Sequence, residues 1–170
     1  MSSKYKTDEN LHEAFGGESK ANRRYIFFAE KAEKEGFPGV AKLFRAAAEA
    51  ETVHARNHLN ALDAIGSTKE NLMAASIGEH QEFTGMYPIF IEVAKEERND
   101  RADRTFALAN AVEKIHHNYF EAALKEVKEG KKPEEKTYYV CQVCGNTVAG
   151  SPQDKCSVCG APKDRFKKVE

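Results

Sequence analysis

The sequence predicts a mainly α-helical protein, in which a bundle of four long helices is followed by a small metal-binding domain. Three observations support this. Apolar residues recur every three or four positions through most of the chain before residue 130, which is the spacing of the buried stripe of a helix. Carboxylates and histidines interrupt this stripe at equivalent places in two halves of the bundle. All four cysteines lie beyond residue 140, in two Cys-x-x-Cys pairs.

The first two helices are predicted to form an antiparallel hairpin. A polar lead ends near Thr7-Asp8, which are suitable N-cap residues, and the first apolar stripe then runs from Leu11 to Ala32. A short connection, Gly36-Phe37-Pro38-Gly39, leads to a second stripe from Val40 to Ile65, and Gly66 is the predicted end of that helix. A connection this short favours antiparallel neighbours.

The second half of the bundle begins with a Ser67-x-x-Glu70 capping box. The third stripe runs from Leu72 to Val93 and contains Pro88, which should kink the helix or remove one of its hydrogen bonds. The stripe keeps its phase on both sides of the proline, so a single helix is expected. The fourth helix is predicted to run from Asn99-Asp100 to about Glu129.

Glutamate and histidine occupy core positions of the second and fourth helices. Glu51 and His54 are three residues apart, as are Glu113 and His116, which places both side chains of a pair on one face of a helix. An ionised carboxylate in an apolar seam is strongly unfavourable unless it is paired or bound to a metal. Two inward-facing Glu-x-x-His pairs therefore indicate a divalent metal.

Residues of the first half of the bundle recur in the second half. The separation is 62 positions for the Glu-x-x-His pair and for one tyrosine, and 61 positions for a lone glutamate. The two halves are thus copies of one helical hairpin. A lone Glu from each of two helices and Glu-x-x-His from each of the other two is the ligand pattern of di-iron carboxylate bundles. The equivalent residues are Glu18 and Glu79, Tyr25 and Tyr87, Glu51 and Glu113, and His54 and His116.

The sequence leaves two possible roles for several side chains near these ligands. Glu82 follows Glu79 by three residues on the same helix face but has no counterpart in the first half, so it is either a seventh ligand or a carboxylate at the edge of the stripe. Tyr25 and Tyr87 are either core aromatics or hydrogen-bond partners of ligand carboxylates, because a buried phenol needs a partner. His58 follows His54 by one turn and is either a residue behind the ligands or a further ligand. The other histidines, His12, His80 and His117, are expected at the surface or rim.

The cysteines form two Cys-x-x-Cys-Gly knuckles. Eleven residues separate the pair Cys141 and Cys144 from the pair Cys156 and Cys159. In such a knuckle the turn directs backbone N–H groups at the sulfurs, and the glycine takes the positive φ that closes the turn. The four thiolates suit either zinc in a structural ribbon or iron in a one-electron centre. So small a domain depends on its metal to fold.

Composition and charge exclude some classes of partner. With a net charge of −1 and interspersed Lys/Arg and Asp/Glu, nothing indicates binding to nucleic acid or to an anionic membrane. Met1 to Asn10 is polar and no apolar run approaches the roughly 20 residues of a membrane span, so a cytoplasmic protein is expected. The predicted domains are the bundle at 1–130, a charged linker at 131–137 and the cysteine domain at 138–170.

Together these motifs resemble the rubrerythrin family over essentially the whole chain. The resemblance implies a ferritin-like di-iron four-helix bundle and a rubredoxin-like domain with one iron. It also implies a peroxidase that reduces hydrogen peroxide to water in oxidative stress defence, with electrons delivered through the rubredoxin-type centre. An alternative is a ferroxidase, or an iron-storage or detoxification protein. The matching elements are Gly17-Glu18-Ser19, Glu51-x-x-His54, Gly78-Glu79-x-x-Glu82, Met86-Tyr87-Pro88, Glu113-Lys114-x-His116 and the double cysteine knuckle.

The resemblance assigns most of the ligands. Glu51 and Glu113 would bridge the two irons. Glu18 would be a terminal ligand of one iron, and Glu79 and His116 would bind the other. The rubredoxin-type iron would be held by Cys141, Cys144, Cys156 and Cys159.

The resemblance also implies a ligand exchange and a set of partners. His54 would bind the first iron in the reduced state and Glu82 in the oxidised state, and Tyr25 and Tyr87 would hydrogen-bond ligand carboxylates. The expected partners are hydrogen peroxide and a redox donor such as rubredoxin or an NAD(P)H-dependent reductase. A second copy of the chain is also expected, in a homodimer or larger homo-oligomer. Relatives commonly place the rubredoxin-type centre of one subunit near the di-iron site of the other.

Overall fold

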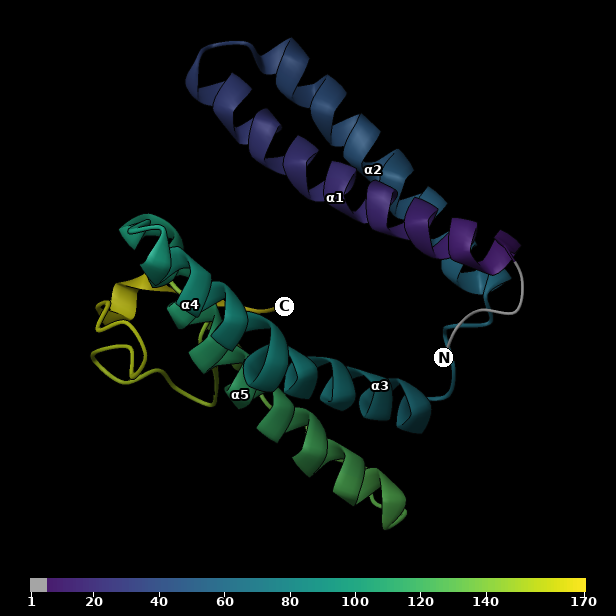
Figure 1. Cartoon of the computed structure of the whole chain (residues 1–170), viewed down its shortest axis with the longest axis vertical. Helices are drawn as coiled ribbons and strands as arrows, with labels where there is room; N and C mark the ends of the chain where they lie inside the picture. Colours follow the sequence, from purple (N-terminus) through teal and green to yellow (C-terminus); the bar gives the residue numbers. More distant parts are fainter. Residues whose placement is uncertain (1–5) are drawn as a thin grey trace. The chain divides into compact units, whose positions relative to one another are not determined.

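The computed structural model describes residues 6–170, which fall into two compact units, Met1–Gly66 and Ser67–Glu170. The first unit is a hairpin of two helices, and the second contains another helical hairpin and a small sheet (Figure 1). The mainly helical fold with a small C-terminal strand domain confirms the predicted fold class.

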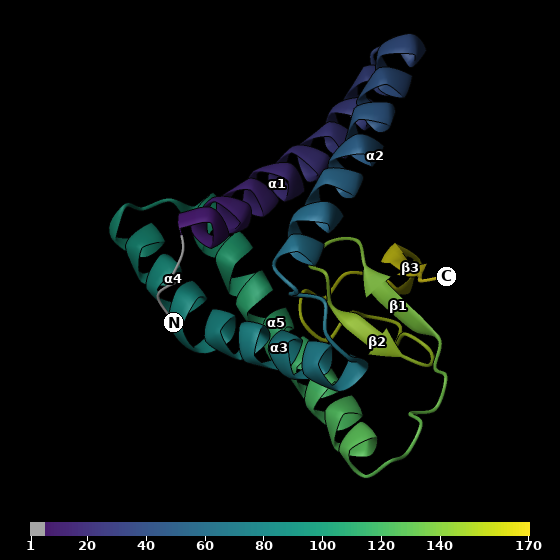
Figure 2. The ribbon, with the colours of Figure 1, turned by 90° about the vertical axis from the view of Figure 1, so that its right-hand side faces the viewer.

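The first unit consists of α1 (Lys6–Lys34) and α2 (Pro38–Ala61), which lie side by side and antiparallel (Figures 1 and 2). Gly36 has a φ of 83° in the short connection, a left-handed conformation that glycine adopts without strain. Alanines dominate the core between the helices, which allows the two backbones to approach closely. The core residues are Ala29, Ala32 and Ala41, with Phe44 packed against them.

Both predicted ends of this hairpin differ from the structure. Thr7 and Asp8 lie inside α1, which is already helical at Lys6; an acidic residue in a first turn is favourable beside the positive end of the helix dipole. The second helix ends at Ala61 and does not continue to Gly66. Asp63 takes a left-handed φ of 50°, which aspartate tolerates better than most residues, and closes the helix early.

The second unit begins with three helical segments that form one continuous helix. They are α3 (Thr68–Gln81), the π-helical turn η1 (Glu82–Met86) and α4 (Tyr87–Glu96). The predicted capping box is confirmed: the Ser67 hydroxyl accepts from the Glu70 N–H, and the Glu70 carboxylate accepts from the Ser67 N–H. The helix α5 (Asp100–Lys128) then packs against all three segments and is capped by Asn99, whose Oδ1 accepts from Ala102 N at 3.1 Å.

The π turn explains how the third helix accommodates Pro88. In η1 the Tyr87 N–H bonds to the carbonyl of Glu82, five residues earlier, so the turn contains one residue more than an α-helical turn. This extra residue also accounts for the unequal repeat. Glu79 precedes Tyr87 by eight positions, whereas Glu18 precedes Tyr25 by only seven. The insertion in the second half is therefore absorbed locally, and one helix is retained as predicted.

The two helical hairpins share an aromatic cluster in equivalent positions. In each unit a tyrosine and two phenylalanines pack together where the two helices meet. The ring-centroid distances agree closely between the units: 6.3, 6.0 and 5.5 Å in the first, and 6.3, 6.3 and 5.5 Å in the second. This agreement supports the predicted duplication. The clusters are Tyr25, Phe28 and Phe44, and Tyr87, Phe90 and Phe106.

The small sheet contains β1 (Tyr138–Cys141), β2 (Thr147–Ala149) and β3 (Phe166–Lys168), in the order β2-β1-β3 with antiparallel pairing. A 3-10 turn, η2 (Lys163–Arg165), precedes β3. The strand β2 contacts α5 (Figure 2). The domain boundaries at 1–130, 131–137 and 138–170 stay a prediction.

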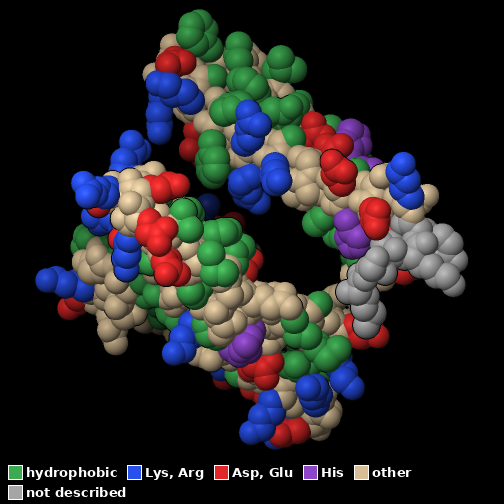
Figure 3. Space-filling model, viewed as in Figure 1, with side chains coloured by type: hydrophobic (Ala, Val, Ile, Leu, Met, Phe, Trp, Pro, Cys, Tyr) green, Lys and Arg blue, Asp and Glu red, His purple; other side chains and the backbone are tan. Residues whose placement is uncertain are grey.

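The surface carries charges of both signs. In the view of Figure 3, Lys and Arg side chains alternate with Asp and Glu over the helices of each unit. Hydrophobic side chains are exposed near the turn of the first hairpin, where Leu43 is 68% exposed and Phe37 is 58% exposed. Within residues 6–170, no helix combines the length and the apolar character needed to cross a bilayer.

Candidate metal centres

The first unit brings Glu18, Glu51 and His54 together. Glu18 lies on α1, and the other two lie one turn apart on α2, where the three-residue spacing places them on the same face. One potential ligand atom from each residue lies within 4.8 Å of the other two. The Nδ1 atom of His54 lies 3.0 Å from Glu51 Oε2 and 3.9 Å from Glu18 Oε1.

This trio is more open than the apolar stripe predicted. The side chain of His54 is 54% exposed, while those of Glu18 and Glu51 are 29% and 17% exposed. A hairpin of two helices buries only the strip between them, and in this unit that strip is occupied by alanines. Within this hairpin His54 is therefore largely exposed, and its place in the buried seam of a four-helix bundle stays a prediction. Its Nδ1 is held by Glu51, whereas the rest of the ring is open.

Glu18 and Glu51 are close enough for their carboxyl groups to form a hydrogen bond. A hydrogen bond with Glu51, followed by burial, raises the pKa of Glu18. Hydrogen bonds with Glu18 and then with His54 lower the pKa of Glu51. The opposite directions of the two shifts reflect the hydrogen bond between these carboxyl groups. A divalent cation bound here would offset the repulsion between them.

The second unit repeats this arrangement with Glu79, Glu113 and His116. Glu79 lies on α3 and the other two lie on α5, and one ligand atom from each falls within 4.8 Å of the others. His116 Nδ1 lies 2.8 Å from Glu113 Oε2 and 3.8 Å from Glu79 Oε1. The trio is better buried than its counterpart, with side-chain exposures of 22%, 16% and 28%.

Burial and mutual repulsion dominate the electrostatics of the second trio. The pKa of Glu79 rises to about 7, first because of burial and then because of the charge of Glu113. The pKa of His116 is raised by its hydrogen bond to Glu113, although burial opposes this effect. Two carboxylates and one imidazole nitrogen are suitable donors for iron, and the surplus of negative charge favours a cation.

Glu82 lies at the start of the π turn and within electrostatic range of the second trio. Its pKa is raised by burial and then by the charge of Glu113, whereas His116 lowers it. The group of ligand atoms within 4.8 Å of one another does not include Glu82. The structure therefore places Glu82 beside the trio, in reach of its charges.

Tyr87 lies within electrostatic range of the second trio, and the rings of both Tyr25 and Tyr87 pack on phenylalanines. Burial, followed by the charge of Glu82, raises the pKa of Tyr87. Among residues 6–170, no hydrogen bond joins the hydroxyl of Tyr25 or Tyr87 to a carboxylate. The hydrogen bonds to metal-ligating carboxylates stay a prediction, and in the structure each ring lies in its aromatic cluster.

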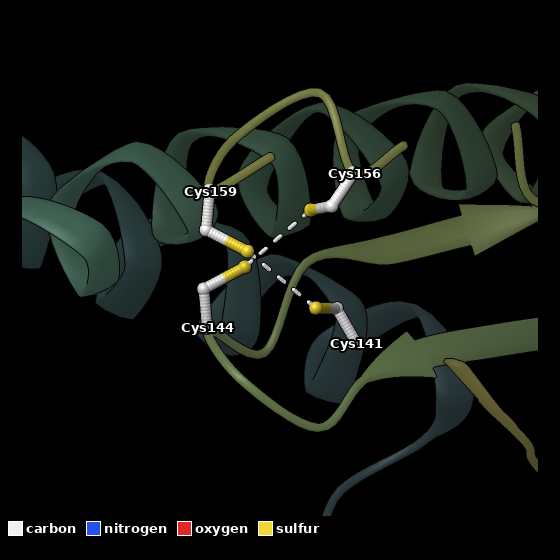
Figure 4. Close-up of side chains that lie close together, drawn as sticks. All are labelled: Cys141, Cys144, Cys156 and Cys159. Carbon is white, nitrogen blue, oxygen red and sulfur yellow. Dashed lines mark hydrogen bonds between the residues drawn. The ribbon is translucent and has the colours of Figure 1, made fainter. Parts of the chain in front are cut away.

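The four cysteines converge on one point at the end of β1 and in the facing knuckle (Figure 4). The Sγ–Sγ distance is 3.7 Å between Cys141 and Cys159 and 3.6 Å between Cys144 and Cys156. A tetrahedral site with metal–sulfur bonds of about 2.3 Å has sulfurs about 3.8 Å apart, so the arrangement fits one tetrahedral metal ion. No disulfide joins these four cysteines.

Hydrogen bonds to the sulfurs prepare this site for thiolates. Although burial acts in the opposite direction, the backbone N–H groups of Cys159 and Val158 and the side chain of Asn146 lower the pKa of Cys156 to about 6. Asn146 is buried, and its Nδ2 lies 3.4 Å from Cys156 Sγ. Burial raises the pKa of Cys144. Sequence reasoning missed Asn146, because its partner lies ten residues away across the knuckles.

A polar network behind the second trio was also missed. His117 was expected at the surface or rim, but it is half-buried, and its Nδ1 lies 3.0 Å from the carbonyl oxygen and 3.1 Å from the hydroxyl of Ser76. The buried Ser76 hydroxyl also donates to Glu121. The repeat offered a signal, because the equivalent residues of the first half are apolar. These are Phe15, Ala55 and Leu59.

Comparisons with known proteins agree along the whole chain. The model of the rubrerythrin family matches residues 9–124, and the model of the rubrerythrin rubredoxin-like domain matches residues 139–167. Rubrerythrin-2 of Clostridium acetobutylicum is 37% identical over 175 aligned positions, which cover 95% of each chain. Rubrerythrin of Nitratidesulfovibrio vulgaris is 33% identical, covering 95% of this chain and 93% of the relative.

Solved structures give the same result. The fully reduced, all-ferrous state of nigerythrin is 31% identical, with a TM-score of 0.58, and the match covers 99% of this chain and 89% of nigerythrin. Its partially reduced state is 30% identical, also with a TM-score of 0.58. The carboxylate–histidine trios and the four converging thiols fit the di-iron site and the rubredoxin-like iron site of such proteins. This chain is therefore a member of the rubrerythrin family, with a di-iron site and a four-cysteine iron site.

Proposed function

We propose that the chain is a cytoplasmic peroxidase that reduces hydrogen peroxide to water in oxidative stress defence. The observation that supports this best is the repeated trio of two glutamates and a histidine, in a chain that also carries a four-thiol site. Reduction of one hydrogen peroxide molecule consumes two electrons and two protons and yields two water molecules. The trios would hold two iron ions, which in the ferrous state would supply those two electrons.

The contacts within each trio support the proposed ligand roles. Glu51 contacts both Glu18 and His54, and Glu113 likewise contacts both Glu79 and His116. A carboxylate in the middle of its trio is well placed to bridge two ions. We therefore assign the bridging role to Glu51 and Glu113 and terminal roles to the others. The proposed di-iron ligands are Glu18, Glu51, His54, Glu79, Glu82, Glu113 and His116.

Glu82 and His54 are proposed to exchange on one iron. The exposure of His54 leaves room around its ring, and Glu82 lies where the regular α3 gives way to the π turn. Ferric iron favours an anionic oxygen ligand more strongly than ferrous iron does, whereas neutral imidazole suits the ferrous ion. The proposed exchange would couple the ligand set to the redox state. Tyr25 and Tyr87 are proposed to lie beside these ligands when metal is bound.

The four-thiolate iron is proposed to receive electrons from outside and pass them to the di-iron site. The donor would be rubredoxin or an NAD(P)H-dependent reductase, and the working form a homodimer or larger homo-oligomer. The hydrogen bonds to Cys156 support a thiolate site that stays charged near neutral pH. A purely structural zinc ribbon would not need a di-iron partner, so the presence of both sites in one chain favours iron.

The proposal is tested by reducing the iron-loaded protein without oxygen and adding one equivalent of peroxide. Stopped-flow absorbance would follow the ferric tetrathiolate band and the ferric di-iron band separately. We expect rapid reoxidation by peroxide and much slower reoxidation by oxygen. A ferroxidase or storage protein would instead react quickly with oxygen and consume further ferrous iron, and that result would refute the peroxidase assignment.

A further inference from the structure

One face of α5 carries both a proposed ligand and the contact surface for the cysteine domain. Val112, His116 and Tyr119 are spaced as neighbours along one side of the helix. Tyr119 accepts a hydrogen bond from Ala149 N at 3.1 Å, and its ring packs edge-on against Tyr138 with centroids 5.8 Å apart. The cysteine domain of the chain thus contacts the helix that supplies His116.

Thr147 is the residue of this contact that touches the ligand itself. Its Oγ1 lies 2.9 Å from His116 Nε2 and 3.3 Å from the carbonyl oxygen of Gly145. Gly145 follows Cys144 directly in the chain. Two hydrogen bonds and a short stretch of backbone therefore connect a sulfur ligand of one metal site to an imidazole ligand of the other.

A metal ion bound to His116 would fix the direction of both hydrogen bonds. Nδ1 of His116 faces the carboxylates of Glu113 and Glu79, so it is the nitrogen that would bind metal. A metal-bound nitrogen carries no proton, and Nε2 of a neutral ring is then the donor. Nε2–H donates to the Thr147 hydroxyl, which in turn donates its own proton to the Gly145 carbonyl. In this arrangement the imidazole N–H and the Thr147 hydroxyl each have an acceptor.

We propose that Thr147 is a positioning residue that fixes the Nε2–H tautomer and the orientation of His116 and links Cys144 to His116 for electron transfer. The electron-transfer part rests on the proposed function. Each electron passed would oxidise the four-thiolate iron from ferrous to ferric and reduce one ferric ion of the pair to ferrous. An external electron-carrier protein would then reduce the four-thiolate iron again. No proton has to move along the link.

Across residues 6–66 the first unit has no such hydrogen bond at Nε2 of its histidine, so the two units can be compared. Its equivalent histidine is His54, and Ala50 and Asn57 stand where α5 has Val112 and Tyr119. Within the described part of the first unit, Nε2 of His54 has no hydrogen-bond partner, and the ring is half exposed. The two proposed histidine ligands thus differ at Nε2: Thr147 contacts that of His116, whereas that of His54 has no partner among the residues described in its unit. This difference suits a fixed electron entry ligand at His116.

The structural part of the proposal is tested in the full-length zinc-loaded protein, which is diamagnetic and needs no turnover. Histidine-labelled nitrogen NMR would report the tautomer of His116 and the exchange of its Nε2 proton with water. We expect a slowly exchanging Nε2–H in the wild type and in Thr147→Ser, which keeps the hydroxyl. Thr147→Val keeps the shape and the strand preference but loses the hydroxyl, so this proton should exchange rapidly.

The functional part is tested by single-turnover reoxidation of the four-thiolate iron after peroxide is added to the fully reduced protein. Removing a hydrogen-bond partner of a metal-ligating histidine typically lowers metal affinity or activity about 10- to 100-fold. We expect a slowing of this size in Thr147→Val and a recovered rate in Thr147→Ser. Tyr119→Phe is the matched control, because it also removes a hydrogen bond between α5 and β2 but leaves His116 untouched. It should retain both the Nε2–H signal and the rate.

The outcomes distinguish a direct effect of Thr147 on His116 from a role in holding the cysteine domain on α5. They also distinguish failure of this proposal from failure of the proposed function. If Tyr119→Phe caused the same losses as Thr147→Val, Thr147 would only hold the domain in place and the proposal would be overturned. A wild-type signal and rate in Thr147→Val would also overturn it. If the wild type itself failed to react with peroxide, the peroxidase assignment would fail, while the NMR result would still decide whether Thr147 positions His116.

Discussion

The shared environment of Glu79 and Glu113 makes the stability of the metal-free protein depend on pH. The folded state raises the pKa of Glu79 from 4.5 to about 7. Between these two values the folded state binds the proton more tightly than the unfolded state does. The stabilising effect is therefore complete below about pH 4.5 and is lost as the pH rises through about 7. At 1.36 kcal/mol per pKa unit, the loss is about 3 kcal/mol.

The assay is urea unfolding of the metal-free full-length protein, followed by circular dichroism at several pH values. Glu79→Gln resembles the protonated acid, so it should match the wild type near pH 4 and exceed its stability by about 3 kcal/mol near pH 8. Glu92→Gln, at an exposed carboxylate of α4, is the matched control and should follow the wild type throughout. Parallel pH curves for the wild type and Glu79→Gln would show that folding does not raise the pKa of Glu79.

Three further predictions concern the π turn and the cysteine domain. Glu82→Ala should keep the fold and both irons of the pair but slow peroxide turnover about tenfold, a loss of about 1.4 kcal/mol in transition-state stabilisation. Wild-type turnover in this variant would make Glu82 an ordinary edge carboxylate. Deleting Gly85 should convert η1 to an α-helical turn and retain the helical dichroism. It should also rotate Glu82 against Tyr87 by about 100° and slow peroxide turnover roughly tenfold. Unchanged turnover would show that the π turn is dispensable. Cys156→Ser should remove the red ferric tetrathiolate colour and unfold only the tail, because that domain depends on its metal. Melting of the helices would show that the predicted boundary near residue 131 is wrong.

The parts of the site that depend on local spacing could be predicted from the sequence. A Glu-x-x-His pair lies on one helix face whatever the helix packs against, so the spacing alone is enough to identify both pairs. The Ser67 capping box and the cysteine knuckles are likewise determined by a few neighbouring residues. These features do not require knowledge of how distant segments meet.

Features that depend on packing could not be predicted in the same way. The unequal repeat reflects an extra residue between Glu79 and Tyr87, but only the backbone shows that a π turn absorbs it. His117 resembles a surface residue in the sequence because its partner Ser76 lies on another helix. Thr147 carries no sequence signal, since its contact with His116 joins a strand to a helix 31 positions away.

The central claim is that the carboxylates and histidines of the two hairpins hold two iron ions in addition to the one held by the cysteines. It is tested most directly by the iron content of protein loaded with iron-57 without oxygen, measured together with its Mössbauer spectrum. We predict about three iron ions per chain, of which about two have oxygen and nitrogen ligands and about one has four sulfur ligands. A protein that bound one iron or none outside the cysteine site would contradict the account.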